Sequence, residues 1–218
     1  MKDKFTLSRK ENLFLAKKTL VNNIYNSAKL EGVNVTFPQT KTILDGMSVS
    51  NVDMDDIQKI LNLRNAWRYV FNTIDADFNL EYAKKINGYV AYNESLDWGV
   101  LRYGNVGISG VNYKPSIPVE KEVLAAIEKI MSIESVTEKA IKYMLYAMRT
   151  QLFWDGNKRT GLICANKILI QHGKGVLTIP EDQLEEFNER LSAFYESNDY
   201  TKIDQFLYEK CLFGIEYN

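Results

Sequence analysis

Residues 151–161 constrain the fold more than any other stretch of this 218-residue chain. They read Gln-Leu-Phe-Trp-Asp-Gly-Asn-Lys-Arg-Thr-Gly, and an apolar run up to Ile170 follows directly. The first backbone N–H groups of a helix have no partners within it and lie at the positive end of its dipole. The pattern therefore predicts a polar loop that opens a helix and binds an anion there. The loop and the helix after it span 151–171.

Helical periodicity dominates most of the remaining chain. Between 97 and 113, however, glycines alternate with β-branched residues, which predicts a short hairpin ended by Pro115 and Pro118. No linker-like segment divides the sequence, so we expect a single domain, 1–218. The predicted fold class is all-α, a helical bundle with a small β-hairpin flap over 97–118. Apolar residues recur every three or four positions in the predicted helices 11–30, 53–74, 79–90, 119–131, 137–152, 156–171, 181–195 and 200–211.

Composition excludes several classes of function. The net charge of -1 gives no electrostatic case for binding nucleic acid. No apolar stretch approaches the roughly 18–20 residues of a membrane span, and the first residues lack the apolar core of a secretory signal. Cys164 and Cys211 lie in apolar helical runs, where free buried thiols are expected. The expected location is the cytoplasm, with no membrane partner.

The side chains of 155–159 have the chemistry of a phosphate site. Gly156 allows a close approach of the backbone to a ligand. Asn157 can donate a hydrogen bond, and Lys158 and Arg159 add positive charge, with the arginine able to hold two phosphate oxygens. Asp155 beside bound phosphates is a natural Mg²⁺ ligand. These residues predict a nucleotide-polyphosphate site with a metal ion.

Three segments, in this order along the chain, resemble the motifs of the Fic (Fido) family. Ser27-Ala-Lys-Leu-Glu31-Gly32 is similar to the S/T-x-x-x-E-G/N motif of that family's inhibitory helix. Residues 99–118 fit its flap pattern G-x-x-R-x-x-x-V-x-I-x-G-x-x-Y-x-P-x-x-P. Phe153 and 155–159 fit its loop motif, H-x-F-x-D/E-G-N-G/K-R.

The resemblance implies a reaction that transfers AMP from ATP to a hydroxyl of a target protein. It implies that Asp155 holds Mg²⁺, that Gly156, Asn157 and Lys158 form the anion hole, and that Arg159 binds phosphate.

It also implies two further sites outside this loop. An extended segment of the target would pair with the flap at Val106, Gly107 and Ile108, as an added strand. Within an inhibitory helix at 10–32, Glu31 would obstruct the nucleotide.

The first departure from the family pattern is Gln151, which stands where the family has its catalytic histidine. A histidine near pKa ~6.5 can take a proton from the attacking hydroxyl, whereas a neutral amide can only hydrogen-bond. Losing a general base costs roughly 10² to 10⁴ in rate. The only histidine, His172, lies 21 positions further on, beyond the next helix, and is a poor substitute.

The second departure is Leu162, at the position of a second arginine that pairs with the inhibitory glutamate in other members. Lys158 or Arg159 could take that role. Three functions remain open: a self-inhibited AMP-transferase relative, a pseudoenzyme that binds a nucleotide or partner, and a Doc-like phosphotransferase. A homo-oligomer is also left open.

Overall fold

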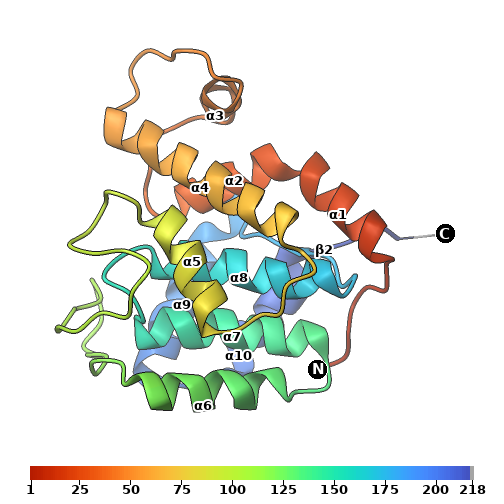
Figure 1. Ribbon diagram of the computed structural model, residues 1–218, viewed down its shortest axis with the longest axis vertical. Coiled ribbons are helices and arrows are strands. Elements are labelled where there is room, and N and C mark those ends of the chain that lie inside the picture. The colour runs from red at the N-terminus through yellow and green to blue at the C-terminus, as the bar shows by residue number, and fades with distance from the viewer. Residues whose placement is uncertain (217–218) are drawn as a thin grey trace.

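The computed structural model describes residues 1–216 as a helical bundle with one small sheet, which confirms the predicted fold class (Figure 1). The strands β1 (Val176–Leu177) and β2 (Leu212–Phe213) pair antiparallel, with Val176 opposite Phe213. A 3-10 turn at Glu181–Gln183 and a π-helical stretch at Leu207–Cys211 flank the last helices. The α-helices are α1 (Arg9–Lys18), α2 (Leu20–Lys29), α3 (Phe37–Leu44), α4 (Met54–Asn72), α5 (Leu80–Val90), α6 (Glu120–Met131), α7 (Val136–Thr150), α8 (Asn157–Gln171), α9 (Leu184–Ser197) and α10 (Thr201–Phe206).

The helix α8 forms the centre of the bundle. It packs most extensively against α7, and α1, α4, α5 and β1 complete its surroundings. Every residue from Arg159 to Ile170 is buried, so this helix has no solvent-facing side along those turns. Most of its residues from Gly161 to Ile170 are apolar, and the buried Asn166 and Lys167 are hydrogen-bonded, as such a position requires. Because α8 is fixed all round, the loop that precedes it is held at a defined place on the surface.

The predicted N-terminal helix is interrupted at Thr19, which separates α1 from α2. The Thr19 hydroxyl donates a hydrogen bond to the Leu15 carbonyl at 2.9 Å, and its backbone there is no longer helical. A threonine that bonds back to the carbonyl four residues earlier commonly bends a helix. The predicted stop at Gly32 is confirmed, because Gly32 has a φ of 70° and Val33 bonds back to Ala28.

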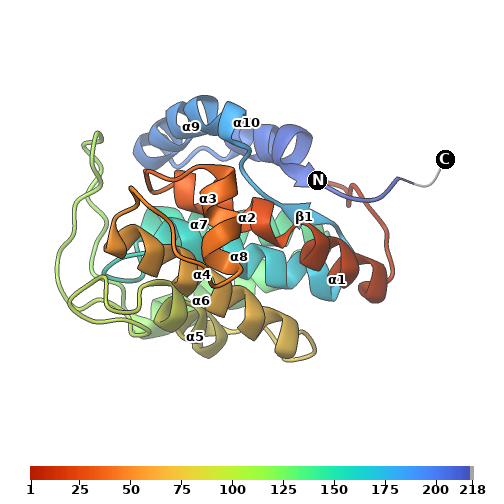
Figure 2. The ribbon, with the colours of Figure 1, turned by 90° about the horizontal axis from the view of Figure 1, so that it is seen from above.

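The predicted hairpin at 97–118 is wrong in one respect, because no strand forms between these residues. The segment is a long extended loop that turns at 109–110 and stands away from the helices (Figure 2). Two of its contacts go to the bundle: the Asn112 N–H donates to Glu196, and the centre of the Tyr113 ring lies 3.8 Å from the Arg149 guanidinium. Two strands alone are marginal in water, and glycines weaken them further.

Two further sequence predictions concern burial and the membrane. Cys164 and Cys211 are both buried free thiols, as predicted. Among the helices of residues 1–216, none combines the length and the apolar character that a bilayer crossing demands.

A buried lysine, Lys167, lies inside the α8 core and is satisfied by neutral oxygens. Its Nζ donates to the carbonyls of Ile74 and Ala76 and to the side chain of Gln171, at 2.6–2.9 Å. Burial lowers the pKa of Lys167 to about 8. The folded protein therefore loses this proton at a lower pH than the unfolded chain does.

The linkage between this proton and folding can be tested with Lys167→Met. Between pH 8 and the ordinary lysine pKa, the unfolded chain binds more protons at this site, so the site's contribution raises stability with pH. We expect the stability of the wild type relative to Lys167→Met to rise between pH 7.5 and 9.5 in urea titrations. The variant Lys121→Met, at an exposed position, serves as the control for losing a lysine charge. A flat difference for Lys167→Met would contradict the prediction.

Candidate functional site

The turn between α7 and α8 is shaped by the side chain of Gln151. This residue ends α7 in the left-handed region, with φ 49°. Its amide nitrogen donates to the Met148 carbonyl at 2.6 Å, and its amide oxygen accepts from Asn157 Nδ2 at 3.1 Å. Gln151 therefore caps the helix and braces the loop, and both ends of its amide are engaged.

The Asn157 side chain closes the loop from the other end. Its Nδ2 also donates to the Phe153 carbonyl at 2.8 Å, and its Oδ1 accepts the Phe153 N–H at 2.9 Å. With 4% of its surface exposed, the residue is a clip across 153–157. Phe153 itself is buried in the core and anchors the turn. The donor that the sequence assigns to a ligand is thus already used within the loop.

The N-terminus of α8 leaves backbone N–H groups of this turn free. Gly156 has a φ of 70°, and a Cβ there would lie 2.9 Å from a Val90 methyl, so glycine is required. The backbone N–H groups of Asn157, Lys158 and Arg159 have no acceptor within residues 1–216, while that of Gly156 donates to the Asp155 carboxylate. Three free donors at the positive end of a 15-residue helix are an arrangement that can bind an anion.

Arg159 is turned away from the loop surface and is 2% exposed. Its Nη2 lies 2.8 Å from Glu94 Oε2, and its Nη1 donates to Glu94 Oε1 at 3.2 Å. Burial opposes the charge of this guanidinium, but Glu31 and Glu94 outweigh burial and raise the pKa of Arg159. Glu94 stands 65 residues from Arg159, and no local pattern in the sequence indicates the pair.

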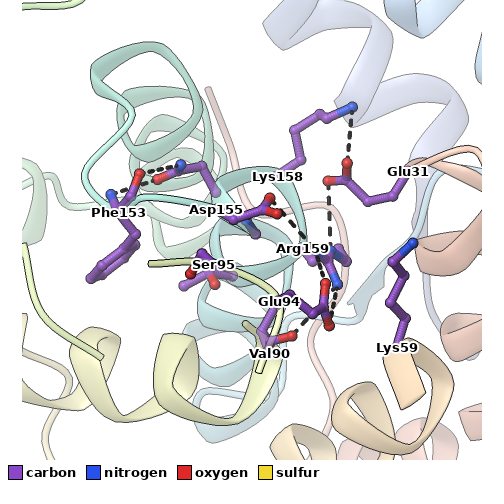
Figure 3. A network of polar contacts seen from close by, with 12 residues as sticks. Glu31, Lys59, Val90, Glu94, Ser95, Phe153, Asp155, Lys158 and Arg159 are labelled. Atoms are coloured by element: carbon purple, nitrogen blue, oxygen red, sulfur yellow. Dashed lines mark hydrogen bonds and ion pairs between the residues drawn. The ribbon is translucent and has the colours of Figure 1, made fainter. Parts of the chain in front are cut away.

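Glu31 reaches both cations of the motif, as Figure 3 shows. Its Oε2 lies 3.6 Å from Lys158 Nζ and its Oε1 lies 3.7 Å from Arg159 Nε. Lys158 Nζ also donates to the Leu30 carbonyl at 3.0 Å, which ties the end of α2 to the start of α8. From the sequence, either Lys158 or Arg159 could pair with Glu31. In the structure Glu31 pairs with both.

The other residues of the predicted inhibitory motif shape the end of α2. Ser27 is buried, at 1% exposure, and does not line the site. Gly32 forms the turn that follows Glu31, and its positive φ directs the chain away from the helix axis. These two residues therefore position Glu31 and make no contact with a ligand space.

A cavity of about 530 Å³ opens beside the loop, within the range of small-molecule sites. The motif residues that line it are Gln151, Trp154, Asp155, Asn157 and Lys158. Glu31, at the end of α2, also lines it. The flap contributes 106–109, which include the predicted docking residues Val106, Gly107 and Ile108. One face of α9 forms the remaining wall, with Asn188, Leu191, Ser192 and Tyr195.

The α9 wall was not anticipated from the sequence. Its four residues follow the spacing i, i+3, i+4, i+7, which places them on one helix face. Such spacing is also typical of a face that packs on the core, and nothing local distinguishes the two. Arg159 and the neighbouring Glu94 do not line this cavity.

The flap is joined to the motif by Arg102, which is 1% exposed. Its guanidinium donates to the carbonyls of Gly104, Pro115, Ser116, Thr150 and Gln151, at 2.5–3.3 Å. Burial lowers the pKa of this group. The guanidinium thus binds both arms of the flap to the end of α7.

Trp154 forms a second contact between the motif and the flap. Its ring packs edge-on against Tyr103, with 5.1 Å between centroids. A Cβ at Gly104 would lie 2.5 Å from the same ring, so the flap backbone passes directly over it. The variable position of the motif therefore supports the flap.

Asp155 could serve as a ligand for a divalent cation. Its side chain is 48% exposed, borders the cavity, and accepts from the Gly156 N–H. No group of three acidic, histidine or cysteine residues within 1–216 could hold a metal ion alone. Mg²⁺ is commonly held by one or two carboxylates together with substrate phosphates, so one carboxylate at this place fits that ion.

Comparisons with known proteins agree with this architecture. Residues 77–169 match the family model described as "Fic/DOC family". The "Protein adenylyltransferase Fic" of Drosophila persimilis is 26% identical over 180 residues, and that of Drosophila melanogaster 27%. These alignments cover 77% of this chain but only 34% and 36% of those relatives, so the chain spans about a third of their length.

Solved structures share the fold at low sequence identity. Fic-1 from C. elegans superposes with a TM-score of 0.76 at 19% identity, covering 88% of this chain and 60% of that one. A Fic-domain signalling protein from Bacteroides thetaiotaomicron gives a TM-score of 0.73 at 18% identity, covering 91% and 80%.

The fold and the solved structures that share it therefore define this molecule as a protein with a Fic-type helical bundle. The segment 77–169 carries the match to the Fic/DOC family model. The resemblance seen in the sequence is thus confirmed at the level of the family and the fold.

The role of Arg102 as the anchor of the flap can be tested with Arg102→Met. This change leaves several buried carbonyls without their donor, and we expect it to lower the free energy of unfolding by about 2–4 kcal/mol. Urea denaturation followed by circular dichroism measures the loss. The exposed control Arg68→Met should shift stability by no more than about 0.5 kcal/mol. Equal losses for the two variants would contradict the assignment.

Proposed function

We propose that this protein binds an adenine nucleotide in the cavity beside the start of α8, and that it is a self-inhibited relative of the protein AMP-transferases. The observation that carries the proposal is the N-terminus of α8, whose free N–H groups and Lys158 border a cavity of about 530 Å³. The similarity to proteins named "Protein adenylyltransferase Fic" supports an adenine nucleotide as the ligand. A phosphate group would lie against the N–H groups of 157–159.

The reaction that this site would perform is the transfer of AMP to a hydroxyl. A hydroxyl of a target protein attacks the α-phosphorus of ATP, pyrophosphate leaves, and the hydroxyl proton must pass to a base. Mg²⁺, held by Asp155 and the phosphates, would supply positive charge for the departing pyrophosphate. The target segment would lie along the flap at 106–108, beside the cavity.

Gln151 makes this transfer slow in the present chain. Its amide has no usable proton affinity, and both of its polar ends are engaged with Met148 and Asn157. A histidine at this position would be near the cavity, because Gln151 lines it. The site therefore keeps the elements for binding and positioning while lacking the group that accepts the proton.

Glu31 is the inhibitory group in this proposal. Its carboxylate borders the cavity and faces Lys158 and Arg159, so it competes with phosphate oxygens for Lys158, the one of these two cations that lines the cavity. The distances of 3.6 and 3.7 Å describe ion pairs without a direct hydrogen bond. Because Glu31 is tied only by these pairs, its removal would open the space without disturbing the motif.

A transfer experiment with ATP labelled at the α- or the γ-phosphate tests this function. The unaltered protein, Glu31→Gly, Gln151→His and the double variant are incubated with cell lysate and Mg²⁺. We expect transfer of the α-label to be strongest in the double variant and at least tenfold weaker in those that keep Gln151, because a general base contributes roughly 10² to 10⁴.

Other outcomes distinguish the alternatives. Transfer of the γ-label alone would identify a Doc-like phosphotransferase. Nucleotide binding with no transfer of either label, even in the double variant, would identify a pseudoenzyme. If Glu31→Gly binds no adenine nucleotide in calorimetry, the proposed function is wrong.

A further inference from the structure

A second cavity, of about 190 Å³, lies at the bend between α1 and α2 and shares no lining residue with the cavity beside α8. The bend and one face of α2 form one side of it, and the chain from β1 onward forms the other. Its apolar walls are Leu15, Val176, Pro180 and Phe213. Because an apolar cavity of roughly 150 Å³ accommodates benzene, this space suits one aromatic ring with a small substituent.

The face of α2 brings amide side chains to this cavity. Asn23 and Asn26 both line it, although only 2% and 5% of their surfaces are exposed. Asn23 Nδ2 donates to the Thr19 hydroxyl oxygen at 3.1 Å, and that hydroxyl donates in turn to the Leu15 carbonyl. Because the hydroxyl has a single proton, already used, the Asn23 amide must direct its nitrogen to Thr19 and its oxygen elsewhere.

The Asn23 Oδ1 atom is an acceptor without a donor. No group of residues 1–216 donates to it, and it is not among the fully enclosed polar atoms, so it is open to the cavity that the residue lines. The neighbouring amide of Asn26 is already joined to the Thr178 hydroxyl, at 3.1 Å. The polar feature that this cavity offers to a ligand is therefore a hydrogen-bond acceptor, set among apolar walls.

The same cavity lies between α2 and the segment that holds this helix in place. The Tyr25 hydroxyl donates to the Glu181 carboxylate, and Lys29 Nζ lies 3.4 Å from the same carboxylate. These contacts fasten α2 to the chain that leads from β1 into α9, two residues before Glu31. A molecule in the cavity would contact both sides and would add to this attachment.

We propose that this cavity is a binding site for a small aromatic molecule that carries an O–H or N–H donor. The ring lies between Leu15, Val176 and Phe213, and the donor bonds to Asn23 Oδ1. Occupation of the cavity strengthens the attachment of α2 to the segment 176–181. Because the two cavities have no lining residue in common, this inference does not rest on the proposed nucleotide-binding function.

Titration with phenol and with toluene, followed by ¹H–¹⁵N NMR, tests the site. The two probes have nearly the same shape, and only phenol has a donor. In the unaltered protein we expect both to shift the backbone amides of 19–26 and 176–178, and to leave those of 155–158 in place.

The variant Asn23→Leu identifies the acceptor. It keeps the volume of the side chain and removes its oxygen, so we expect phenol affinity to fall at least threefold relative to toluene affinity. Comparing the two probes within each variant cancels any general loosening of the cavity. The control Asn34→Leu, at an exposed position outside the cavity, should keep the ratio of the unaltered protein.

Amide hydrogen exchange measures the effect on α2 in the unaltered protein, whether or not Asn23→Leu folds. At a phenol concentration ten times its dissociation constant, openings that detach α2 should become about tenfold rarer. We expect exchange of the amides of 20–29 to slow at least fivefold. Exchange within α6, which does not line the cavity, should stay unchanged.

Any one of three results would overturn the inference. The first is an absence of shifts at 19–26, or shifts confined to 155–158. The second is the same ratio of phenol to toluene affinity in Asn23→Leu as in the unaltered protein. The third is unchanged exchange in α2 at saturating phenol. None of these results bears on nucleotide binding, and a failure to bind adenine nucleotide would leave this inference standing.

Discussion

The hydrogen bonds of the Asn157 side chain are the contacts on which the rest of the site depends. They hold the backbone of Phe153 and the amide of Gln151, and so fix the turn that leads from α7 into α8. Because α8 is buried on all sides, this turn cannot shift without disturbing the core. The free N–H groups at its start are therefore presented rigidly, which favours binding of an anion without reorganisation.

The ionic groups around Arg159 show how one arginine can be removed from a ligand site without being lost from the sequence. A buried guanidinium without a carboxylate would be strongly destabilising, and Glu94 prevents this. The same pairing withdraws the arginine from the cavity. The Arg159 side chain can either pair with Glu94 or bind a ligand. In this structure its Nη1 and Nη2 pair with Glu94.

The sequence predicted the parts of the fold that depend on local chemistry. Helix periodicity, the stop at Gly32 and the helix start at Gly156 follow from rules that act within a few residues, and the structure has them at those places. The hairpin failed because strand formation depends on partners, and the arms of the flap bond to Arg102 and the bundle instead. A glycine-rich alternating pattern cannot by itself distinguish a paired strand from an extended loop.

For the site, too, the features set by local motifs were predictable and those that depend on distant contacts were not. The turn at 151–159 and the position of Glu31 near two cations were predictable from the motifs, because the family resemblance places them together. Glu94 and the α9 face were not, since their roles arise from contacts across 65 residues or more of sequence or from helix faces that resemble core packing.

The walls of the cavity lie in three separate parts of the chain. The segment that matches the family model, 77–169, supplies the turn and the flap. Glu31 comes before this segment and the α9 wall comes after it. In the proposed function the phosphate would therefore lie within the matched segment, whereas two walls of the nucleotide's cavity come from outside it. A match to the family model alone thus leaves Glu31 and the α9 wall undescribed, and these are the parts of the cavity that only the structure brings to the turn.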